Sequence, residues 1–420
     1  MKILLIVVII AVLLICTLAE PDFFEVPDAG SAAPSLPQKE PRGLTKAVWL
    51  SQYDLCDVYF DGNEQRRAGE FSALVGEMLD NCVSLGFDSV IVQVRPNGDS
   101  MYPSAIFCPS SYVVGGYGEK FEYDPFSIIV SLAKARGLSV HAWVNPLRLM
   151  TLSQIESIGD DYIIGKWWRD GEKRGKYIVE FEGRLYLNPA YAEVRSLIAD
   201  GAAEVARKYP IDGVHIDDYF YPHGISSDFD DEAYALCANG VPLLEWRREN
   251  ISVLVKAMRD SVKSVREELL FGVSPGGNLS TAYALDCADV YKWCASDEYV
   301  DYICPQIYFG LEHETCAFDA TYEKWESIVG PEVELYVGIT LGKAVNGSLG
   351  IADSYAGSGR AEWIESKRVL ADCLEFLKNK SSLCGIAVFC YGYFYDPVSG
   401  EPNGAVGAEL ENFLPVFGGM

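Results

Sequence analysis

Asp212-Gly213-Val214-His215-Ile216-Asp217-Asp218-Tyr219-Phe220-Tyr221-Pro222 has the pattern of a buried strand that ends in two adjacent carboxylates and an aromatic cluster. Side chains alternate along a strand, so the Val and Ile of this segment share one face, and His215 and Asp217 share the other. In a parallel strand covered by helices, the Val and Ile face packs on those helices. We therefore expect His215 and Asp217 to point into a barrel interior, with Asp218 at the carboxyl end of the strand.

The rest of the chain repeats this arrangement, with short apolar strands alternating with amphipathic helices. Eight strands are predicted at Ala47–Tyr53, Ser89–Val94, Ser139–Val144, Gly213–Ile216, Phe271–Val273, Tyr302–Gln306, Leu335–Ile339 and Gly385–Phe389. Helices are predicted at Gln65–Leu85, Pro125–Arg136, Ala190–Lys208, Leu243–Leu270, Thr321–Val329 and Ala361–Lys378. Eight regularly spaced βα units favour an α/β fold that is a single (β/α)₈ TIM barrel. The nucleotide-binding patterns GxGxxG and GxxxxGKS/T follow none of these strands.

The connection after the third strand, roughly residues 150 to 190, is too long for a simple loop. It contains Trp167-Trp168 and two segments with strand character, Tyr177–Phe181 and Arg184–Leu187. We expect an inserted hairpin here, over the mouth of the barrel.

The first residues predict export across a bacterial cytoplasmic membrane. An apolar run from Ile3 to Ala19 follows Lys2 and precedes an acidic segment, which is typical of a signal peptide or a membrane anchor. The residues before Cys16 also resemble a lipoprotein box, although bulky Ile15 fits it poorly. We therefore expect residues 1–19 to be a leader or membrane tether, residues 20–44 a Pro-rich linker, and residues 45–420 the barrel, secreted or held at the cell surface.

Composition narrows the classes of partner. The net charge of −26 argues against nucleic acid as a ligand. Aromatic residues make up 12% of the chain, enough to line a surface where sugar rings stack, although most aromatic residues in any protein pack in its core. The 12 cysteines include no CxxC pair, and we expect Cys82, Cys304, Cys373 and Cys390 to be small buried hydrophobic residues.

The carboxyl ends of the predicted strands carry a concentrated polar set, and in such barrels active sites are assembled there. The candidate substrate-binding residues are Asp54, Arg95, His141, Trp143, Asn145, His215, Tyr219, Gln306, Tyr308 and Tyr391. Asp217, Asp218 and Asp99 are the candidate catalytic carboxylates. Simpler interpretations stay open: His141 and His215 as core histidines with their hydrogen bonds satisfied, and Asp99 as a turn-stabilising residue.

Several segments in the same order resemble the family-10-like glycosyl hydrolases, a barrel family that includes divisome-associated cell-wall hydrolases. The matching segments are Val90–Arg95 with Gly98-Asp99, Tyr123-Asp124-Pro125, Arg136–Pro146, Leu187-Asn188-Pro189, Asp212–Pro222, Val273-Ser274-Pro275 and Pro305–Tyr308. The resemblance implies a glycoside hydrolase whose substrate class is bacterial cell-wall glycan, the polymer of N-acetylglucosamine and N-acetylmuramic acid. It also implies a possible association with the cell-division machinery.

The choice of mechanism depends on which carboxylates can pair. Most glycosidases use two, about 5 to 9 Å apart. Here the sixth strand ends in Gln306 and Tyr308 instead of an acid. We therefore expect the acetamido oxygen of the substrate to attack the anomeric carbon. Asp217 would polarise that group and Asp218 would protonate the leaving oxygen, although the two roles are exchangeable, and Asp99 is the reserve carboxylate.

Two other functions remain open. His141, His215, Asp217, Asp218 and His223 could hold a metal for deacetylation or phosphoester cleavage, but the chain has no HxH or HExxH pattern and we expect neither a metal nor a cofactor. A barrel that binds glycan without cleaving it is the other alternative, because a fold does not determine a function.

Overall fold

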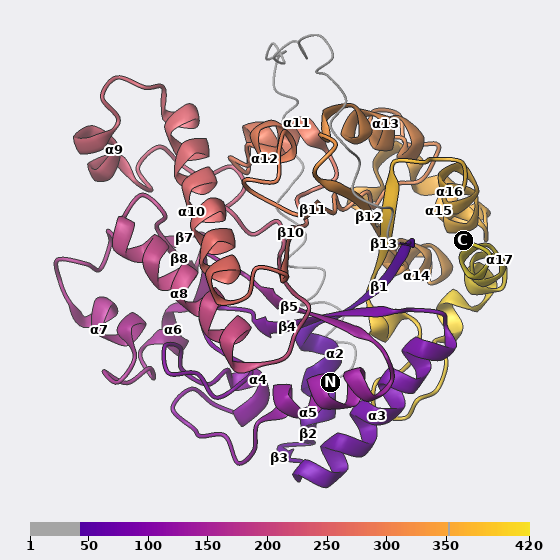
Figure 1. The fold of residues 1–420 in the computed structure, drawn as a ribbon, viewed down its shortest axis with the longest axis horizontal. Helices are drawn as coiled ribbons and strands as arrows, with labels where there is room; N and C mark the ends of the chain where they lie inside the picture. The colour runs from indigo at the N-terminus through magenta and orange to yellow at the C-terminus, as the bar shows by residue number, and fades with distance from the viewer. Residues whose placement is uncertain (1–42, 352) are drawn as a thin grey trace.

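The computed structural model describes residues 43–351 and 353–420, so the expected leader and residues 20–42 of the expected linker lie outside the described residues. The described chain forms a closed barrel of eight strands, in the order β1-β13-β12-β11-β10-β9-β5-β4 (Figure 1). All neighbouring pairs in it are parallel. The expected single (β/α)₈ barrel is therefore confirmed.

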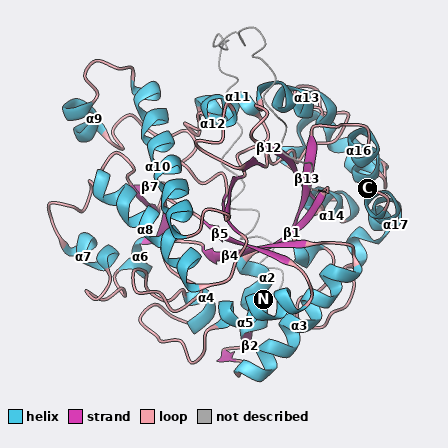
Figure 2. Cartoon of the chain, viewed as in Figure 1, coloured by secondary structure: helices cyan, strands magenta, loops and turns pink. Residues whose placement is uncertain are grey.

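The barrel strands are short, and the helices between them form an outer ring (Figure 2). The strands are β1 Thr45–Leu50, β4 Ser89–Arg95, β5 Ser139–Val144, β9 Gly213–Ile216, β10 Leu270–Val273, β11 Tyr302–Ile303, β12 Glu334–Thr340 and β13 Leu383–Phe389. The longer helices are α3 Ala68–Ser84, α5 Pro125–Ala135, α8 Ala192–Lys208, α10 Leu243–Val265, α13 Phe318–Ile328, α16 Val369–Leu377 and α17 Gly407–Gly418. Shorter helices are α2 Gln52–Tyr59, α4 Ser111–Val114, α6 Leu152–Ile155, α7 Ile163–Arg169, α9 Asp231–Cys237, α11 Leu279–Ala284, α12 Val290–Cys294, α14 Gly342–Ser348 and α15 Arg360–Glu365, with 3₁₀ turns at Ser354–Gly359, Tyr391–Tyr393 and Gly404–Val406.

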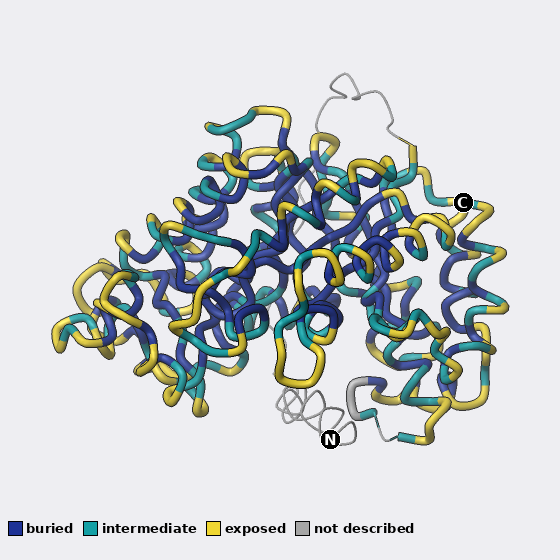
Figure 3. Tube along the Cα trace, turned by 90° about the horizontal axis from the view of Figure 1, so that it is seen from below, coloured by how far each residue is buried: buried dark blue, intermediate teal, exposed yellow. Residues whose placement is uncertain are grey.

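The hydrophobic core has two main parts. The larger part fills the layer between the strands and the surrounding helices, and burial is concentrated in the centre of the molecule (Figure 3). The smaller part lies inside the barrel and includes Trp49, Trp143, Tyr302 and Tyr336. Gly272 makes room for it, since a Cβ at that position would lie 1.9 Å from the Tyr302 ring. The barrel interior is therefore packed with side chains at this level, as in other barrels of this size.

The insertion after the third barrel strand, β5, contains the predicted hairpin. β7 Ile178–Phe181 and β8 Arg184–Leu187 pair antiparallel, and their turn has positive φ at Glu182 and Gly183. A third strand, β6 Arg148–Thr151, adds to β8 and makes a three-stranded sheet that the sequence did not predict. Because β6 begins soon after β5 ends, the insertion borders the carboxyl end of the barrel.

Some element boundaries were wrong. The first strand ends at Leu50, not Tyr53, because Ser51 and Asp54 form a capping box that starts α2. The predicted helix Gln65–Leu85 begins later, after a small β2–β3 hairpin (Phe60–Asp61 and Glu64–Gln65). The predicted helix Ala361–Lys378 is two helices, α15 and α16, interrupted where Ser366 is extended.

Two further findings concern the cysteines and the apolar character of the helices. The predicted buried cysteines, Cys82, Cys304, Cys373 and Cys390, are all buried, and the eleven cysteines in residues 43–351 and 353–420 are unpaired. Among these same residues, no helix combines the length and apolar character required to cross a bilayer.

Candidate active site

Asp217 and Asp218 follow β9 directly and lie at the carboxyl end of the barrel. A series of three hydrogen bonds connects Asp217 to other strand ends. The Gln52 backbone N–H donates to Gln93 Oε1 (2.7 Å), Gln93 Nε2 donates to Asn145 Oδ1 (2.9 Å), and Asn145 Nδ2 donates to Asp217 Oδ2 (2.9 Å). This chain runs from the end of β1 across β4 and β5 to the end of β9. It fixes the Asp217 carboxylate, whose residue is only 3% exposed.

The two carboxyls differ in their surroundings. Asp217 is fully buried, and burial followed by the charge of Asp218 raises its pKa well above the usual range. Asp218 is half-buried. Burial, then the charge of Asp286, raises the pKa of Asp218 to about 6, while hydrogen bonding from Gln306 and the charge of Arg148 oppose this rise. Within the described residues, neither Asp forms an ion pair at 4.0 Å or less. The pair is therefore one held carboxyl beside one accessible carboxyl that carries a proton near pH 6.

Further predicted residues surround the pair. Gln306 bridges the ends of β10 and β12 through Gly276 and Gly338, and its Nε2 donates to the Ser274 carbonyl (3.0 Å). Tyr219 and Tyr308 are half-buried, and the charge of Asp218 acts on both hydroxyls. The structure therefore brings together seven of the predicted site residues: Trp143, Asn145, Asp217, Asp218, Tyr219, Gln306 and Tyr308.

Arg148 was missed as a site residue. It is the first residue of β6, and its guanidinium lies over the Tyr219 ring, 4.7 Å from the centroid. It is also the cation whose charge lowers the pKa of both Asp217 and Asp218. Its position shortly after the third predicted strand was the available signal, but the start of a third strand in the insertion was not predicted.

Asp286 and His223 were also missed in their observed roles. His223 Nδ1 lies 2.9 Å from Asp286 Oδ1, and both side chains are partly exposed. The hydrogen bond that His223 donates to Asp286 raises the pKa of His223. His223 was considered only as a metal ligand. Asp286 lies between β10 and β11, where the sequence pattern was weak, so no strand-end rule pointed to it.

The expected substrate-binding role of Arg95 is corrected. Simple alternation would place it beside Ile91 and Gln93 inside the barrel, but the pairing of β4 with β5 shifts register between Gln93 and Arg95. The shift turns Arg95 outward. Its guanidinium instead lies over Phe107, 4.5 Å from the ring centroid, and packs so closely on α8 that a Cβ at Gly201 would lie 2.2 Å from Nη1.

The expected roles of Asp99 and Asp54 in the site are also corrected. Both are buried hydrogen-bond acceptors that hold loops together. Asp99 is fully buried and accepts from the Asn97 backbone N–H (2.9 Å) and the Tyr117 hydroxyl (3.1 Å), which favours its turn-stabilising interpretation over a reserve catalytic role. Asp54 accepts from the backbone N–H of Ser51 (2.7 Å) and of Gly392 (2.8 Å). It thereby connects the capping box of α2 to the segment after β13.

Tyr391, like Asp99 and Asp54, makes a structural contact away from the carboxylate pair. It is 1% exposed and its hydroxyl accepts from Asn81 Nδ2 on α3 (3.0 Å). Its expected substrate-binding role is therefore corrected to a packing contact.

The barrel interior accounts for three more predicted residues. His141 Nδ1 and His215 Nδ1 both lie within hydrogen-bond distance of the Tyr302 hydroxyl, at 2.9 and 2.8 Å. Burial, then the charge of His141, lowers the pKa of His215 well below its usual range, so His215 is neutral. Trp143 is 6% exposed in the same core. The expected direct contact of the two histidines with substrate is corrected, because they form the buried layer on which the site rests. Trp143 belongs to this layer and also reaches Asp217, whose pKa its side chain lowers.

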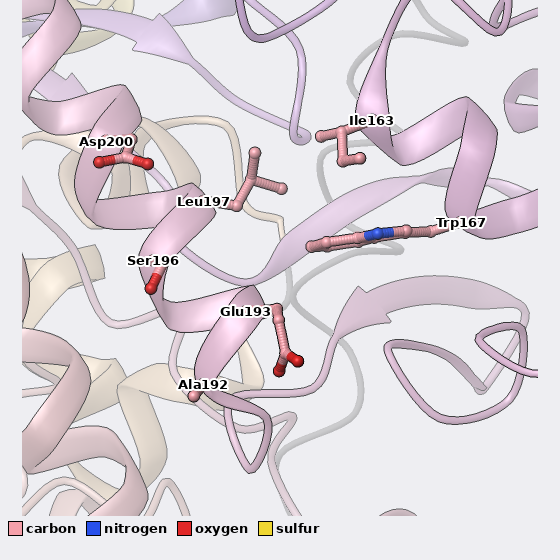
Figure 4. A pocket seen from close by; sticks show the side chains of 7 residues that line it. All are labelled: Ile163, Trp167, Ala192, Glu193, Ser196, Leu197 and Asp200. Carbon is pink, nitrogen blue, oxygen red and sulfur yellow. The ribbon is translucent and has the colours of Figure 1, made fainter.

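Two surface hollows lie apart from the carboxylate pair. One, of about 370 Å³, is lined from α7 by Ile163 and Trp167 and from α8 by Glu193, Ser196 and Leu197 (Figure 4). The other, of about 580 Å³, is lined by residues around α9 and α10, including Trp246 and Arg248. Both are on the helical exterior. The predicted Trp167 therefore lines an outer flank instead of the barrel mouth.

The metal-dependent alternative requires several His, Cys, Asp or Glu side chains to lie close together. In the parts of the chain that the structure describes, no three of them are grouped so that they could hold a metal ion. His141 and His215 both contact Tyr302 inside the barrel, whereas His223 pairs with Asp286.

Comparison with known proteins places this geometry in a family. The model of the family described as glycosyl hydrolase-like 10 matches residues 45–356. The chain belongs to the glycosyl hydrolase-like 10 family. This membership confirms the resemblance found from the sequence motifs and places the chain among glycoside hydrolases.

Curated relatives of this glycosyl hydrolase-like 10 chain carry matching names. The glycosyl hydrolase YngK of Bacillus subtilis strain 168 is 32% identical over 315 residues, which cover 70% of this chain and 60% of YngK. The glycosyl hydrolase DigH of Escherichia coli K12 is 30% identical over 362 residues, which cover 78% of this chain and 80% of DigH. The chain thus spans less than two thirds of the length of YngK.

Solved structures with the same fold are more distant. The PgaB (BpsB) glycoside hydrolase domain from Bordetella bronchiseptica has a TM-score of 0.52 at 12% identity, over 89% of this chain and 98% of that one. The catalytic domain of β-amylase from Paenibacillus polymyxa has a TM-score of 0.52 at 10% identity, over the same shares of the two chains. These likenesses concern the fold alone.

Proposed function

We propose that this glycoside hydrolase cleaves an N-acetylhexosamine-containing cell-wall glycan, peptidoglycan, with help from the acetamido group of the substrate. The observation that carries the proposal is the difference between two adjacent carboxyls. Asp217 is buried and held by Asn145, whereas Asp218 is half-buried with a pKa near 6. Adjacent residues suit this mechanism because both carboxyls act on the same face of one sugar unit.

The surroundings assign the two roles. A group that orients the acetamido nitrogen must stay fixed while charge develops, and Asp217 is held by Asn145 Nδ2 and by the Tyr219 backbone N–H (3.4 Å). A general acid must carry a proton at the working pH and reach the leaving oxygen. Asp218 is the more accessible carboxyl, and its raised pKa keeps it protonated up to about pH 6.

The reaction then has two balanced steps. The acetamido oxygen attacks the anomeric carbon, the bond from that carbon to the leaving oxygen breaks, and Asp218 gives its proton to that oxygen. Asp217 and Asp218 are a coupled pair that shares one proton, and in the reactive state that proton is on Asp218. The ionised Asp217 accepts a hydrogen bond from the acetamido N–H and stabilises the positive charge on the resulting oxazolinium ring. Water next attacks the anomeric carbon, the ring opens, and the proton of the water returns to Asp218.

A displacement by two carboxylates has less support. The residues facing Asp218 from the sixth strand are the amide of Gln306 and the phenol of Tyr308, as the sequence indicated. Asp286 is the nearby acid from another element, and it is hydrogen-bonded to His223. A carboxylate nucleophile would have to be directed at the anomeric carbon from another element, whereas the acetamido group is already beside that carbon.

Export supports the choice of substrate. Residues 3–19 form an apolar run of the kind that directs a chain across the cytoplasmic membrane. We propose that the barrel acts at the cell surface or as a secreted protein, where cell-wall polysaccharide is its partner. No feature of the described residues points to a division protein as a second partner, so that association remains an implication of the family resemblance.

The test is hydrolysis of purified peptidoglycan by the full chain, with stem peptides present and with stem peptides removed, followed by mass analysis of the soluble products. The expected result is release of sugar fragments from at least one substrate. Asp217→Asn and Asp218→Asn should each slow release by roughly 10²–10⁴-fold while the fold is retained, because each removes a group that acts in the transition state.

Two other outcomes would favour the alternatives. If the wild-type chain binds glycan and releases no fragments, and both Asn variants bind equally well, the chain is a glycan-binding barrel. If a chelator abolishes release and an added divalent metal restores it, the metal-dependent alternative is correct.

A further inference from the structure

His223 and Asp286 form a charged pair next to the proposed general acid. His223 is five residues after Asp218 in the loop that follows β9, and Asp286 comes from the segment after α11. His223 Nδ1 and Asp286 Oδ1 are 2.9 Å apart. Asp286 Oδ2 lies 3.9 Å from the position of a Cβ on Gly276, so this carboxylate sits above the end of β10, the strand next to β9. The pair thus faces Asp218 across neighbouring strand ends.

The groups around Asp218 come from several elements. Asp217 and Tyr219 are its chain neighbours, Arg148 comes from β6, and Tyr308 follows β11. Asp286 is the acid from a separate element whose charge acts on Asp218. Of these groups, Asp286 favours the protonated form of Asp218, and Arg148 favours the ionised form.

We propose that His223 and Asp286 form a positioning dyad that holds the proton on Asp218 until it passes to the leaving oxygen. The inference rests on the proposed function of Asp218. Asp286 acts through its negative charge, which opposes ionisation of its neighbour. His223 acts through Asp286, because its hydrogen bond keeps that half-buried carboxylate ionised and oriented.

The charge balance of the dyad agrees with this role. Burial raises the pKa of Asp286, and the hydrogen bond and charge of His223 oppose the rise. The pKa of His223 is raised in turn by the same hydrogen bond, with a smaller contribution from Glu182. The hydrogen bond therefore favours the imidazolium form of His223 and the carboxylate form of Asp286. After water attacks the anomeric carbon, the same carboxylate favours return of the proton to Asp218.

A direct test follows the titration of Asp218 without substrate. The full chain is labelled with ¹³C at the aspartate carboxyls, and the resonance absent from Asp218→Asn identifies Asp218. In Asp286→Asn the midpoint of this resonance should fall by about one pH unit, because a neighbouring negative charge is removed. In the wild-type background, His223→Gln should lower the Asp218 midpoint, because His223 keeps Asp286 ionised. In the Asp286→Asn background, the same substitution should leave the midpoint unmoved.

The control is Asp228→Asn, which removes one negative charge from an exposed position in the same loop as His223. It should leave the Asp218 midpoint in place. An unchanged midpoint in Asp286→Asn, or an equal shift in Asp228→Asn, would overturn the dyad.

Activity measurements separate this inference from the proposed function. On a glycan that the wild-type chain cleaves, the rate should fall above the Asp218 midpoint. In Asp286→Asn this alkaline limb should move to lower pH by the same amount as the titration. A wild-type chain that cleaves no glycan rejects the proposed function while the titration still decides the dyad. A wild-type chain that cleaves, with an alkaline limb that Asp286→Asn leaves unmoved, rejects the dyad alone.

Discussion

At the scale of single residues, the Asp217–Asp218 pair carries a folding cost that goes with its proposed chemistry. A carboxyl whose pKa is higher in the folded than in the unfolded chain destabilises the fold once it ionises. Burial imposes this cost on both residues, the charge of Asp218 adds to the cost at Asp217, and the charge of Asp286 adds to the cost at Asp218. Active sites commonly combine such costs with function, since the same burial that destabilises an anion makes it a useful acid.

Asp218→Asn should therefore stabilise the protein at neutral pH while it removes activity. The folded pKa of about 6 lies above the usual 3.8, so the penalty appears as pH rises from about 4 and is complete above about 6. Two pKa units correspond to about 3 kcal/mol, and partial exposure of Asp218 reduces the expected gain to about 1–2 kcal/mol. Urea unfolding at pH 7.5 and pH 4 measures it: the gain should be present at the higher pH and absent at the lower. A destabilised variant at pH 7.5 would contradict the assignment.

The strand-end rule predicted part of the site from sequence and missed the rest for identifiable reasons. Asn145, Asp217 and Gln306 follow strands whose alternation is regular, so their positions could be read directly. Arg95 could not, because a register shift reverses its direction and leaves no mark in the residue types. Asp286 belongs to a connection, whose path depends on packing instead of periodicity.

The capping role of Asp54 was the exception, since its signal was present in the sequence. Ser51 and Asp54 have the spacing of a capping box, which predicts a helix start. Under that interpretation Asp54 is a structural acceptor, as the structure shows.

At the scale of elements, the connection from β9 to α10 carries the candidate acid and must be held in place. A buried ion pair does this: Arg247 Nη2 on α10 and Asp230 Oδ1 are 2.6 Å apart, with side-chain exposures of 2% and 0%. The Tyr221 hydroxyl also donates to Asp230 (2.9 Å), and Arg247 donates to the Ser226 carbonyl (2.8 Å). Three positions of the connection are therefore fixed to α10 or to each other through one carboxylate and one guanidinium.

Arg247→Met should destabilise the protein by roughly 3–5 kcal/mol, because it leaves Asp230 buried without its counter-ion. The free energy of unfolding in urea measures the loss. Arg248→Met is the matched control, since its guanidinium stacks on Tyr283 at a partly exposed position. The control should cost less than about 1 kcal/mol. Equal losses in the two variants would show that the buried pair does not hold the connection.

Element existence was predicted more accurately than element ends. The strands and the main helices follow apolar periodicity, which is set by burial, and each of the eight predicted barrel strands overlaps a strand of the structure. The break between α15 and α16 was missed because Leu370 and Trp363 continue an apolar pattern across it. β6 was missed because it becomes a strand only by pairing with β8, at the edge of the inserted sheet.

At the scale of the whole molecule, a closed barrel presents the ends of eight strands to one site. The aromatic and histidine layer inside the barrel supports the polar layer above it, in which Gln93, Asn145 and Asp217 are connected. This layering explains why the candidate site residues come from points far apart in the chain. The proposed chemistry of the carboxylate pair requires an acetamido group on the substrate.

This requirement is tested by measuring the cleavage rate on glycan strands before and after chemical removal of their N-acetyl groups. The two substrates have the same sugar backbone and differ in the group that the mechanism uses as its nucleophile. The wild-type chain should cleave the acetylated strands and act on the deacetylated strands more slowly by on the order of 10²-fold or more. Equal rates on the two substrates would rule out the acetamido group as the nucleophile.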